Sequence, residues 1–332
     1  MVKILMMGAR DDEATAAKNW ANKNNVDLTT TPEILDNSTY HLLEGYDGLS
    51  LQQTMGIPDD MYTRLKEDGF TQIAQRSAGI DMYNLDEAKK QGISITNVPA
   101  YSPNSVSEFA VGSALNCLRH TQEVQNRVKA HDFTWDEKII STEVRSLTVG
   151  ILGTGRIGQI TAKIFKGFGA NVIGYDLYKN PNIEDILTYI DDFDNFLEQS
   201  DLIVIHLPLT KENHHLFNKE TFAKMKPGAI LINVARGAIV DTKSLIEALD
   251  SRQISCCAID TYENEMPYVT KNWADKPLED PLLEELIKRE DVLYTPHIAF
   301  YTKTSVKNLV EGALNSCYSI LTTGSADTIV NP

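Results

Sequence analysis

The chain has 332 residues, of which 42% are hydrophobic and 23% are charged, and its formal net charge at pH 7 is −15. This length is too great for one ordinary hydrophobic core, so we expect two domains. The negative charge and the lack of a Lys/Arg cluster in the sequence argue against a nucleic-acid partner, because a phosphate backbone needs a basic face.

The N-terminus and the cysteines bear on location and on metal binding. The apolar run from Met1 to Gly8 is too short for a signal peptide and is followed at once by acidic residues, and no apolar run in the sequence reaches membrane-spanning length. The cysteines form no CxxC pair and have no metal-ligand spacing with histidine. We therefore expect a cytoplasmic protein with reduced thiols, no membrane partner and no metal.

Short apolar strands alternate with helical stretches through the first hundred residues. We expect strands at residues 3–7, 48–51, 72–76 and 93–96 and helices at 13–23 and 85–91. This alternation is typical of an α/β domain with a parallel sheet. Two prolines predict an extended linker at 97–103, after which Ser102 suits the N-cap and Pro103 the first position of a helix.

A second α/β run begins at Leu147. The expected strands are 148–152, 171–175, 202–206, 229–233, 257–260 and 292–294, and the expected helices include 157–168 and 242–249. Strands and helices in this number and order are what a complete dinucleotide-binding sheet needs. The last helical stretch, 302–321, has no strand after it, and we expect it to pack on the first domain.

A glycine-rich loop follows the first strand of this second run. Gly153, Gly155 and Gly158 form a GxGxxG pattern between an apolar strand and an amphipathic helix. The first glycine permits a tight turn, the second lets the backbone approach a pyrophosphate, and the third lets helix and strand pack closely. The helix N-terminus offers N–H groups to the phosphates, and Arg156 could add a charged contact.

The next strand ends at Asp176, roughly 20 residues after the last glycine, where a carboxylate that binds the ribose hydroxyls is expected. A carboxylate repels a 2′-phosphate. The sequence therefore predicts NAD rather than NADP as the cofactor.

Three further strands are each followed by polar residues. Arg236 follows strand 229–233, Asp260, Glu263 and Glu265 follow the next strand, and His297 follows the last one, directly after Pro296. Ligands bind outside the carboxyl ends of strands in open α/β sheets, so these side chains are expected to converge beside the nicotinamide.

These residue types suit the reduction of a 2-keto acid. Hydride transfer to a ketone builds charge on its oxygen, and a histidine that titrates near neutrality can protonate it. A neighbouring carboxylate favours the imidazolium form and fixes its orientation, and an arginine fork binds the substrate carboxylate.

The sequence resembles the D-isomer-specific 2-hydroxyacid dehydrogenase family over nearly its full length. The matching segments are Gly150–Gly158, His206–Pro208, Met225–Gly228, Asn233–Gly237, Asp260–Glu263 and Thr295–His297. The resemblance implies that Arg236 binds the substrate carboxylate and carbonyl, that Glu265 partners histidine, and that His297 is the acid/base. On the cofactor side it implies roles for Gly153, Gly155, Arg156, Ile157, Gly158, Asp176, Leu207, Pro208, Asn213, Val234, Ala235, Arg236 and Asp260.

The family also implies two Rossmann-like, doubly wound α/β domains with parallel sheets and the active-site cleft between them. Residues 1–100 with 299–332 would form a flavodoxin-like substrate-binding domain, and residues 101–298 the NAD-binding Rossmann domain. The helix 102–120 and the loop after it resemble the dimerisation region of the family, so we expect a homodimer.

Within the family, the closest likeness is to the D-lactate dehydrogenase branch of lactic acid bacteria, which reduces pyruvate to D-lactate with NADH. That branch usually has tyrosine before a Gln-Gln pair, whereas Leu51 stands there, as in D-2-hydroxyisocaproate dehydrogenases. Bulkier 2-keto acids therefore stay open as substrates. The residues expected to bind substrate are Leu51, Ala78, Gly79, Tyr101, Phe300 and Tyr301.

Two other classes compete with this interpretation. A non-catalytic NAD-binding regulator of the same fold is disfavoured by the complete set of Arg236, Glu265 and His297. An L-specific dehydrogenase would place its dinucleotide-binding unit at the N-terminus, whereas here that unit begins near residue 147.

Overall fold

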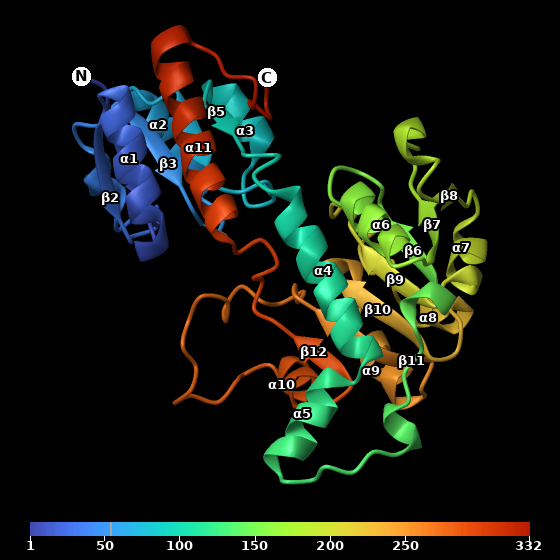
Figure 1. Ribbon diagram of the computed structural model, residues 1–332. Coiled ribbons are helices and arrows are strands. Elements are labelled where there is room, and N and C mark those ends of the chain that lie inside the picture. The colour runs from blue at the N-terminus through green and yellow to red at the C-terminus, as the bar shows by residue number, and fades with distance from the viewer. Residues whose placement is uncertain (54) are drawn as a thin grey trace. The chain divides into compact units, whose positions relative to one another are not determined.

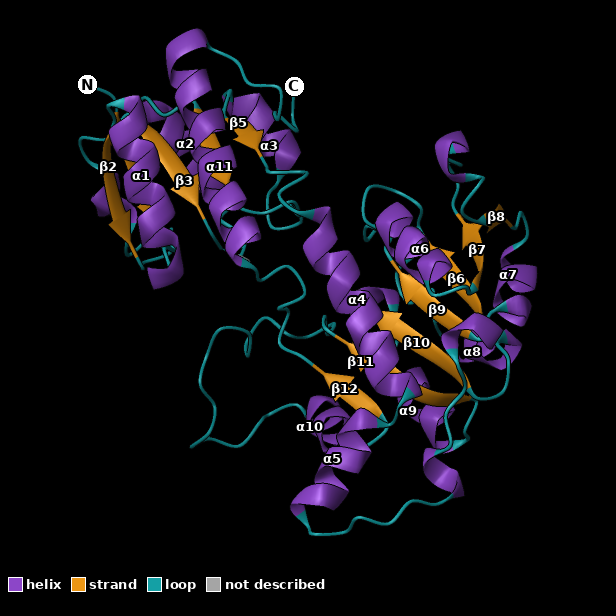
Figure 2. Cartoon of the chain, in the orientation of Figure 1, coloured by secondary structure: helices purple, strands orange, loops and turns teal. Residues whose placement is uncertain are grey.

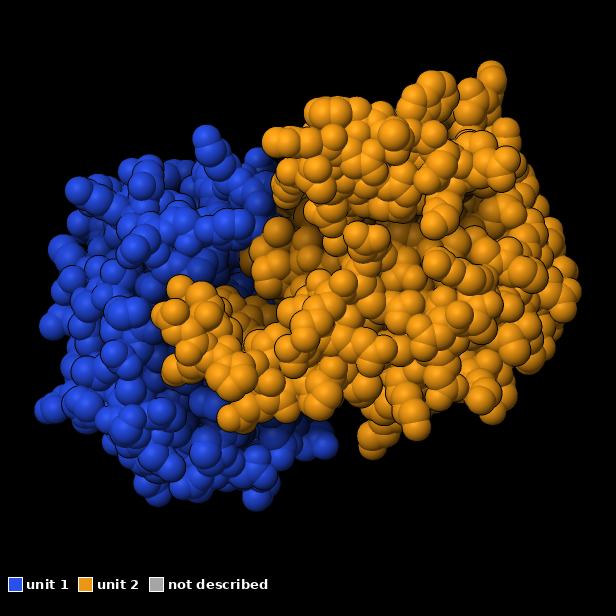
Figure 3. Space-filling model, turned by 90° about the horizontal axis from the view of Figure 1, so that it is seen from below, with its two compact units in different colours: residues 1–102, 301–332 blue, residues 103–300 orange. Residues whose placement is uncertain are grey.

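The computed structural model describes residues 1–53 and 55–332, and the chain divides into two compact units. Unit 1 comprises Met1–Ser102 and Tyr301–Pro332, and unit 2 comprises Pro103–Phe300 (Figure 3). Unit 2 is thus inserted into the chain of unit 1. The boundaries expected from the sequence, after residues 100 and 298, lie two residues before these.

The sheet of unit 1 is parallel and has the strand order β2-β1-β3-β4-β5. Counted along the chain this is the 2-1-3-4-5 order of flavodoxin-like folds. The strands are β1 (Lys3–Met7), β2 (Asp27–Thr31), β3 (Gly48–Leu51), β4 (Gln72–Gln75) and β5 (Ser94–Thr96).

The central strands of this sheet are covered on both faces. Every residue of β3 and β4 is buried, as expected for parallel strands between two layers of helices. One layer contains α1 (Ala14–Asn24) and α11 (Lys303–Thr323), which contact each other and lie in front of the strands in Figure 1. The other helices, α2 (Asp59–Glu67) and α3 (Leu85–Gln91), also contact each other.

Helix α11 is the last helix of the chain and packs within unit 1, as the sequence predicts. It begins after Thr302, whose Oγ1 accepts a hydrogen bond from Ser305 N at 3.2 Å, and it ends at Gly324, whose φ of +80° is left-handed. Its buried face includes Leu309, Ala313 and Cys317, and it contacts β3 and β4.

The sheet of unit 2 is parallel and has the order β12-β11-β10-β9-β6-β7-β8. This is the doubly wound dinucleotide-binding order with one further strand beside the last. The strands are β6 (Thr148–Leu152), β7 (Asn171–Tyr175), β8 (Thr188–Tyr189), β9 (Leu202–Ile205), β10 (Ala229–Asn233), β11 (Ile254–Ile259) and β12 (Val292–Tyr294).

Helices form two layers around this sheet. Helices α4 (Pro103–Leu118) and α6 (Gly158–Gly167) contact each other on the face turned to the viewer in Figure 2. A second series of contacting helices comprises α7 (Phe193–Gln199), α8 (Lys219–Lys224), α9 (Thr242–Asp250) and α10 (Pro281–Lys288). The remaining helix, α5 (Thr121–Lys129), follows α4. Among the described residues, every helix is too short or too polar to cross a membrane.

The sequence did not predict α2, β2 or β8, and it predicted a loop where α5 follows the helix at 102–120. Strand β2 has the sequence DLTTT and lies at a sheet edge with no fully buried residue, and β8 has two residues. The ends of the other expected elements agree with the structure or differ from it by at most three residues. The largest shift is in β11, which begins at Ile254 rather than at residue 257.

Candidate active site

The glycine-rich loop leads from β6 into α6. Gly153 has a φ of +91°, a conformation that L side chains rarely adopt. A Cβ on Gly158 would lie 1.9 Å from the carbonyl oxygen of Gly153, so the helix can begin this close to the strand only with glycine. A Cβ on Gly155 would meet no atom of the described residues within 4 Å. The loop is therefore tight where the protein packs on itself and open at the position expected to face a pyrophosphate.

Asp176, the first residue after β7, contacts the same loop. Its Oδ2 accepts hydrogen bonds from Thr154 N at 2.7 Å and Thr154 Oγ1 at 3.1 Å, and its Oδ1 accepts one from Tyr178 N at 2.9 Å. The carboxylate is partly exposed beside the start of α6. Each oxygen can accept further bonds, so this position fits a group that binds the two ribose hydroxyls.

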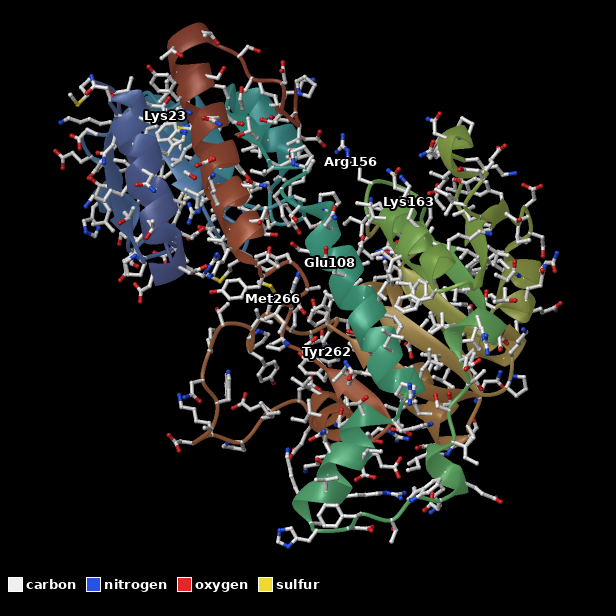
Figure 4. All side chains as sticks on the ribbon, viewed as in Figure 1. Lys23, Glu108, Arg156, Lys163, Tyr262 and Met266 are labelled. Atoms are coloured by element: carbon white, nitrogen blue, oxygen red, sulfur yellow. The ribbon has the colours of Figure 1, made fainter. Side chains whose placement is uncertain are left out.

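The remaining residues expected at the cofactor differ in exposure. Arg156 is exposed at the N-terminal end of α6, where Figure 4 labels it, and Ile157 is half-buried. Pro208 is exposed and Leu207 half-buried, and Asn213 holds their loop by donating to Pro208 O at 2.7 Å and accepting from Thr210 N at 2.7 Å. The side chain of Val234 is almost wholly buried, whereas Ala235 is half-buried.

The expected catalytic residues follow three neighbouring strands of unit 2. In the sheet register Asn233 of β10 lies beside Ile259 of β11, and Ile259 lies beside Tyr294 of β12. The three strands therefore end level with one another. Arg236 and His297 come three residues after their strands, and Asp260 comes directly after its own, so one edge of the sheet gathers all three.

Asp260 anchors the segment that carries His297. Its side chain is 1% exposed, and it accepts hydrogen bonds from Thr295 Oγ1 at 2.6 Å, Ile298 N at 2.9 Å and Ala299 N at 2.8 Å. Its backbone oxygen accepts the N–H of His297 at 2.8 Å. Burial raises the pKa of Asp260, although these hydrogen bonds act in the opposite direction.

His297 has a left-handed φ of +57°. Such a conformation costs energy in a residue other than glycine and persists only when the surroundings impose it. Here the bonds to Asp260 on either side of His297 impose it. The ring meets Phe300 edge-on, with 6.3 Å between the ring centroids.

Glu265 and His297 form a hydrogen-bonded pair. The distance from His297 Nδ1 to Glu265 Oε1 is 2.6 Å, and Glu265 Oε2 accepts the N–H of Tyr262 at 2.9 Å. Both carboxylate oxygens are thus in use. If Nδ1 donates to Glu265, the other ring nitrogen, Nε2, is the atom that can exchange a proton with a substrate.

The electrostatic environment favours the charged form of this histidine. Burial of the imidazole lowers the pKa of His297, and so does the charge of Arg236. The hydrogen bond to Glu265 and the negative charges of Glu265 and Asp260 raise this pKa by more than the other two effects lower it. The net result is a pKa of His297 above its ordinary value. The group therefore suits the delivery of a proton near neutral pH.

Arg236 lies in the turn after β10. Asn233, fully buried at the end of that strand, holds the turn by donating to Arg236 O at 3.0 Å and accepting from Ala235 N at 3.1 Å. The Arg236 guanidinium donates to Ala235 O at 2.9 Å and is half-buried. Its charge acts on His297, so the two side chains share one electrostatic site.

Unit 1 carries most of the residues expected to bind substrate. Ala78 and Gly79 lie in the turn after β4, and the surrounding side chains hold this turn by its carbonyl groups. Asn97 Nδ2 donates to Ala78 O at 2.7 Å, and Ser77 Oγ donates to Gly79 O at 2.6 Å. Tyr101 is half-buried, and its backbone oxygen accepts a bond from Asn308 of α11 at 2.6 Å, whereas Tyr301 is 50% exposed. The sixth residue, Phe300, belongs to unit 2.

Leu51 lies in the core of unit 1, and its contact with the substrate stays a prediction. Its side chain is 0% exposed and packs in the core of unit 1 with Leu49, Met61 and Ile73. It is the last residue of β3, and every side chain of that strand is buried. The structure therefore gives no support to the expectation that Leu51 lines the substrate pocket, because the side chain has no surface to present.

The comparison with known proteins agrees with the geometry. Residues 111–299 match the family model described as "D-isomer specific 2-hydroxyacid dehydrogenase, NAD binding domain". A D-lactate dehydrogenase of Staphylococcus aureus is 47% identical over 331 residues, which cover 100% of both chains. The chain belongs to the D-isomer-specific 2-hydroxyacid dehydrogenase family.

Solved structures of this family extend the likeness to the fold. A D-lactate dehydrogenase of Treponema pallidum superposes with a TM-score of 0.89 at 41% identity and 98% coverage of both chains. A D-2-hydroxyisocaproate dehydrogenase superposes with a TM-score of 0.91 at 37% identity and 100% coverage of both chains. The family assignment makes the protein an NAD-dependent oxidoreductase and excludes the L-specific alternative.

Sequence reasoning missed several residues that build this site. It did not predict that the Asp260 carboxylate anchors the His297 segment, for which the Thr295-Pro-His motif was the available signal; a contact of Asp260 with NAD stays a prediction. It also missed His206, whose Nε2 contacts Thr161 Oγ1 of α6 at 2.9 Å and whose pKa is lowered to about 3 by burial. A histidine of this kind is held neutral, so it is unsuited to proton donation near neutral pH.

Proposed function

We propose that this protein is a D-lactate dehydrogenase that reversibly reduces pyruvate to D-lactate with NADH. The observation that carries the proposal is the Glu265–His297 pair, which shares the sheet edge with Arg236. A charged imidazole beside a guanidinium suits a substrate with a carboxylate next to a carbonyl. The full-length relatives named D-lactate dehydrogenase support the choice of substrate.

In this proposal each residue has one task. His297 donates a proton to the carbonyl oxygen of the 2-keto acid, and Glu265 orients and stabilises the imidazolium. Arg236 binds the substrate carboxylate and polarises the carbonyl. The bound NADH supplies the hydride. The N–H groups of Ala78 and Gly79 are proposed to bind the substrate carboxylate as well.

We propose cofactor contacts that fit the loop geometry. The N–H groups at the start of α6 and Arg156 bind the pyrophosphate, and Asp176 binds the ribose hydroxyls. The tight turn, the open position at Gly155 and the partly exposed carboxylate all fit this group. Contacts of NAD with Leu207, Pro208, Asn213, Val234 and Ala235 stay predictions, as do substrate contacts of Tyr101, Phe300 and Tyr301.

A second candidate is a dehydrogenase for bulkier 2-keto acids. It is favoured by the high TM-score with the D-2-hydroxyisocaproate dehydrogenase. The experiment compares kcat/KM for pyruvate, phenylpyruvate and 2-ketoisocaproate, measured by NADH oxidation, and determines the enantiomer formed. We expect pyruvate to be preferred and D-lactate to be the product. A higher value for 2-ketoisocaproate would support the second candidate, and no NADH oxidation with any of the three would refute both.

We also propose that the protein is a homodimer. In the segment after α5, Phe133, Trp135 and Ile140 are 73%, 88% and 72% exposed. Unit 2 also has a groove of about 840 Å³ lined by residues of α4, α5, β11 and β12. Exposed apolar side chains of this size are typical of a protein–protein interface, and the occupant we propose is a second copy of the chain.

Light scattering tests this assembly. The wild-type protein should have the mass of a dimer, and Trp135→Ser combined with Ile140→Ser should shift it toward the monomer. Ile287→Ser, on an exposed isoleucine of α10, is the matched control and should leave the dimer intact. A monomeric wild-type protein would refute the proposal. The cytoplasmic location expected from the sequence stays a prediction.

A further inference from the structure

A second histidine–carboxylate pair lies in unit 2, beside the proposed catalytic pair in the sequence. Glu263, two residues before Glu265 in the same loop, contacts His215, with 2.8 Å between Glu263 Oε2 and His215 Nε2. The other ring nitrogen of His215 lies 3.3 Å from Asp241 Oδ2. His215 therefore bridges two carboxylates from different parts of the chain.

Both carboxylates are also fixed by the first turn of α9. Glu263 Oε1 accepts the N–H of Thr242 at 3.1 Å, and Asp241 caps the helix by accepting the N–H of Ser244 at 2.6 Å. Acidic groups are favourable at a helix N-terminus, where N–H groups lack partners within the helix. The loop that carries Glu265 is thus attached to α9 through the side chain of Glu263.

The segment that carries His215 is hydrogen-bonded to the turn that carries Arg236. His215 N donates to Ala238 O at 2.8 Å, and Phe217 N donates to Ile239 O at 3.0 Å. His215 has a φ of +52°, so its own backbone is held in an unfavourable region. Its ring also contacts that of His214 in a tilted arrangement, with 4.0 Å between the ring centroids.

The Arg236 turn and the Glu265 loop pack directly on each other. A Cβ on Gly237 would lie 2.1 Å from the carbonyl carbon of Tyr262 and 2.3 Å from Glu263 N, so the two backbones touch at this glycine. A cavity of about 10 Å³ lined by Gly237, Thr261 and Glu263 lies between them, room for about one water molecule. A displacement of one loop must therefore displace the other.

We propose that the His215–Glu263 pair is a positioning device for the reaction, which holds the Glu265 loop against the Arg236 turn. Neither residue of the pair is assigned to bind substrate or cofactor. They act through Glu265, which orients His297, and through Arg236, which binds the substrate carboxylate. The inference rests on the roles proposed above for these three residues.

The test compares His215→Leu with two variants that isolate the contact. His215→Gln keeps a side-chain N–H that can donate to Glu263, and His214→Leu makes the same change at the exposed neighbouring residue. The measurements are kcat/KM for pyruvate as a function of pH, and the Kd of NADH from the quenching of protein fluorescence.

We expect His215→Leu to lower kcat/KM by about 10- to 100-fold, since a misplacement of about 1 Å in a catalytic group can cost about 100-fold. The pH at which kcat/KM falls should also move downward, because Glu265 is held less firmly against His297. The Kd of NADH should not change. A loss of folded protein alone would lower the activity without moving the pH profile. His215→Gln should recover most of the activity, and His214→Leu should match the wild type.

Three results would overturn the inference: His215→Leu with the rate and pH profile of the wild type, an equal loss in His214→Leu, or a lower rate with an unmoved pH profile. If His215→Leu fails to fold, Glu263→Gln serves instead, because it keeps an acceptor for Thr242 N while removing the charge. The pH profile of Glu263→Gln should also move downward. An unmoved profile would overturn the inference. Failure of the proposed function would be seen separately. It would appear as a wild-type protein that is inactive on pyruvate, or as a His297→Gln variant that remains active.

Discussion

Replacing Glu265 with glutamine removes the charge beside His297 with little change in shape. The structure uses both carboxylate oxygens of Glu265, one for His297 Nδ1 at 2.6 Å and one for Tyr262 N at 2.9 Å. A glutamine offers one oxygen and an NH₂ group. The variant can therefore satisfy His297 or Tyr262 but not both, and in either case it loses the negative charge.

The size of the effect follows from the contact. A hydrogen bond to a charged group contributes about 1.5–3 kcal/mol. The side chains of His297 and Glu265 are 34% and 16% exposed, so solvent screening favours the lower end of that range. About 1.4 kcal/mol corresponds to a factor of about 10 in an equilibrium constant. We therefore expect the proton affinity of His297 to fall about tenfold in Glu265→Gln.

The pH dependence gives the direction. Pyruvate reduction needs the imidazolium, which is present below the pKa of His297 and is lost as the pH rises through it. Lactate oxidation needs the neutral imidazole, so its rate increases as the pH rises through the same pKa. Glu265 raises the pKa of His297. Replacing Glu265 should therefore move both the fall in pyruvate reduction and the rise in lactate oxidation to lower pH. At pH values above the wild-type pKa of His297, kcat/KM for pyruvate should fall about tenfold.

The assay records kcat/KM against pH in both directions, for the wild type, for Glu265→Gln and for Glu279→Gln. Glu279 is an exposed glutamate of the same connection between β11 and α10, so its variant makes the same change in net charge away from His297. It should reproduce the wild-type profile. The Glu265–His297 contact would not set the protonation of His297 if Glu265→Gln left both pH profiles unmoved. The same would hold if the profiles of pyruvate reduction and lactate oxidation moved in opposite directions.

Three further predictions concern single side chains. His297→Gln should lower kcat for pyruvate by about 10²- to 10⁴-fold while the Kd of NADH stays within about twofold, and activity within tenfold of wild type would remove His297 from the chemistry. Asp176→Ala should lower kcat/KM for NADH and raise it for NADPH in steady-state assays. Equal use of both cofactors by the wild type would contradict the role of Asp176 in selecting NAD. Leu51→Ala should lower the free energy of unfolding by about 2–5 kcal/mol, because it leaves a cavity in a packed core. It should leave the ratio of kcat/KM values for pyruvate and phenylpyruvate unchanged, and a large change in that ratio would return Leu51 to the substrate pocket.

Local patterns were enough to predict the strands that organise the site. The central strands β6, β9 and β10 are apolar runs flanked by turn residues, and the GxGxxG loop and Asp176 follow from spacing. Such features depend on residues that are neighbours in the sequence. A strand that is buried on both faces appears there as a continuous apolar run. The parallel sheets then place the carboxyl ends of β10, β11 and β12 together.

The missed elements give a weaker signal. Strand β2 is polar because it lies at an edge, where exposed side chains need not be apolar. Helix α2 had a usable pattern, since Met61, Tyr62 and Leu65 form a buried face after Pro58, but it is only 9 residues long. Short elements such as these owe their structure to packing more than to local preference.

Within the site, what the sequence leaves open has a different origin. Leu51 was assigned to a pocket from its place beside Gln52 and Gln53, yet alternation along β3 does not separate a buried face from an exposed one when both faces are covered. The contact of His215 with Glu263 joins residues 48 positions apart and depends on the packing of two loops. Nothing in the local sequence marks such a pair.

The order of the two units along the chain has a consequence for synthesis. On a ribosome, β1–β5 emerge first, but α11, which contacts β3 and β4, emerges only after the whole of Pro103–Phe300. Domains generally fold as units while the chain is made. Unit 2 can therefore complete its fold during translation, whereas the nascent unit 1 leaves the apolar surface beneath α11 uncovered until the last few dozen residues leave the exit tunnel. During that interval the uncovered surface is where a chaperone would bind or aggregation would begin.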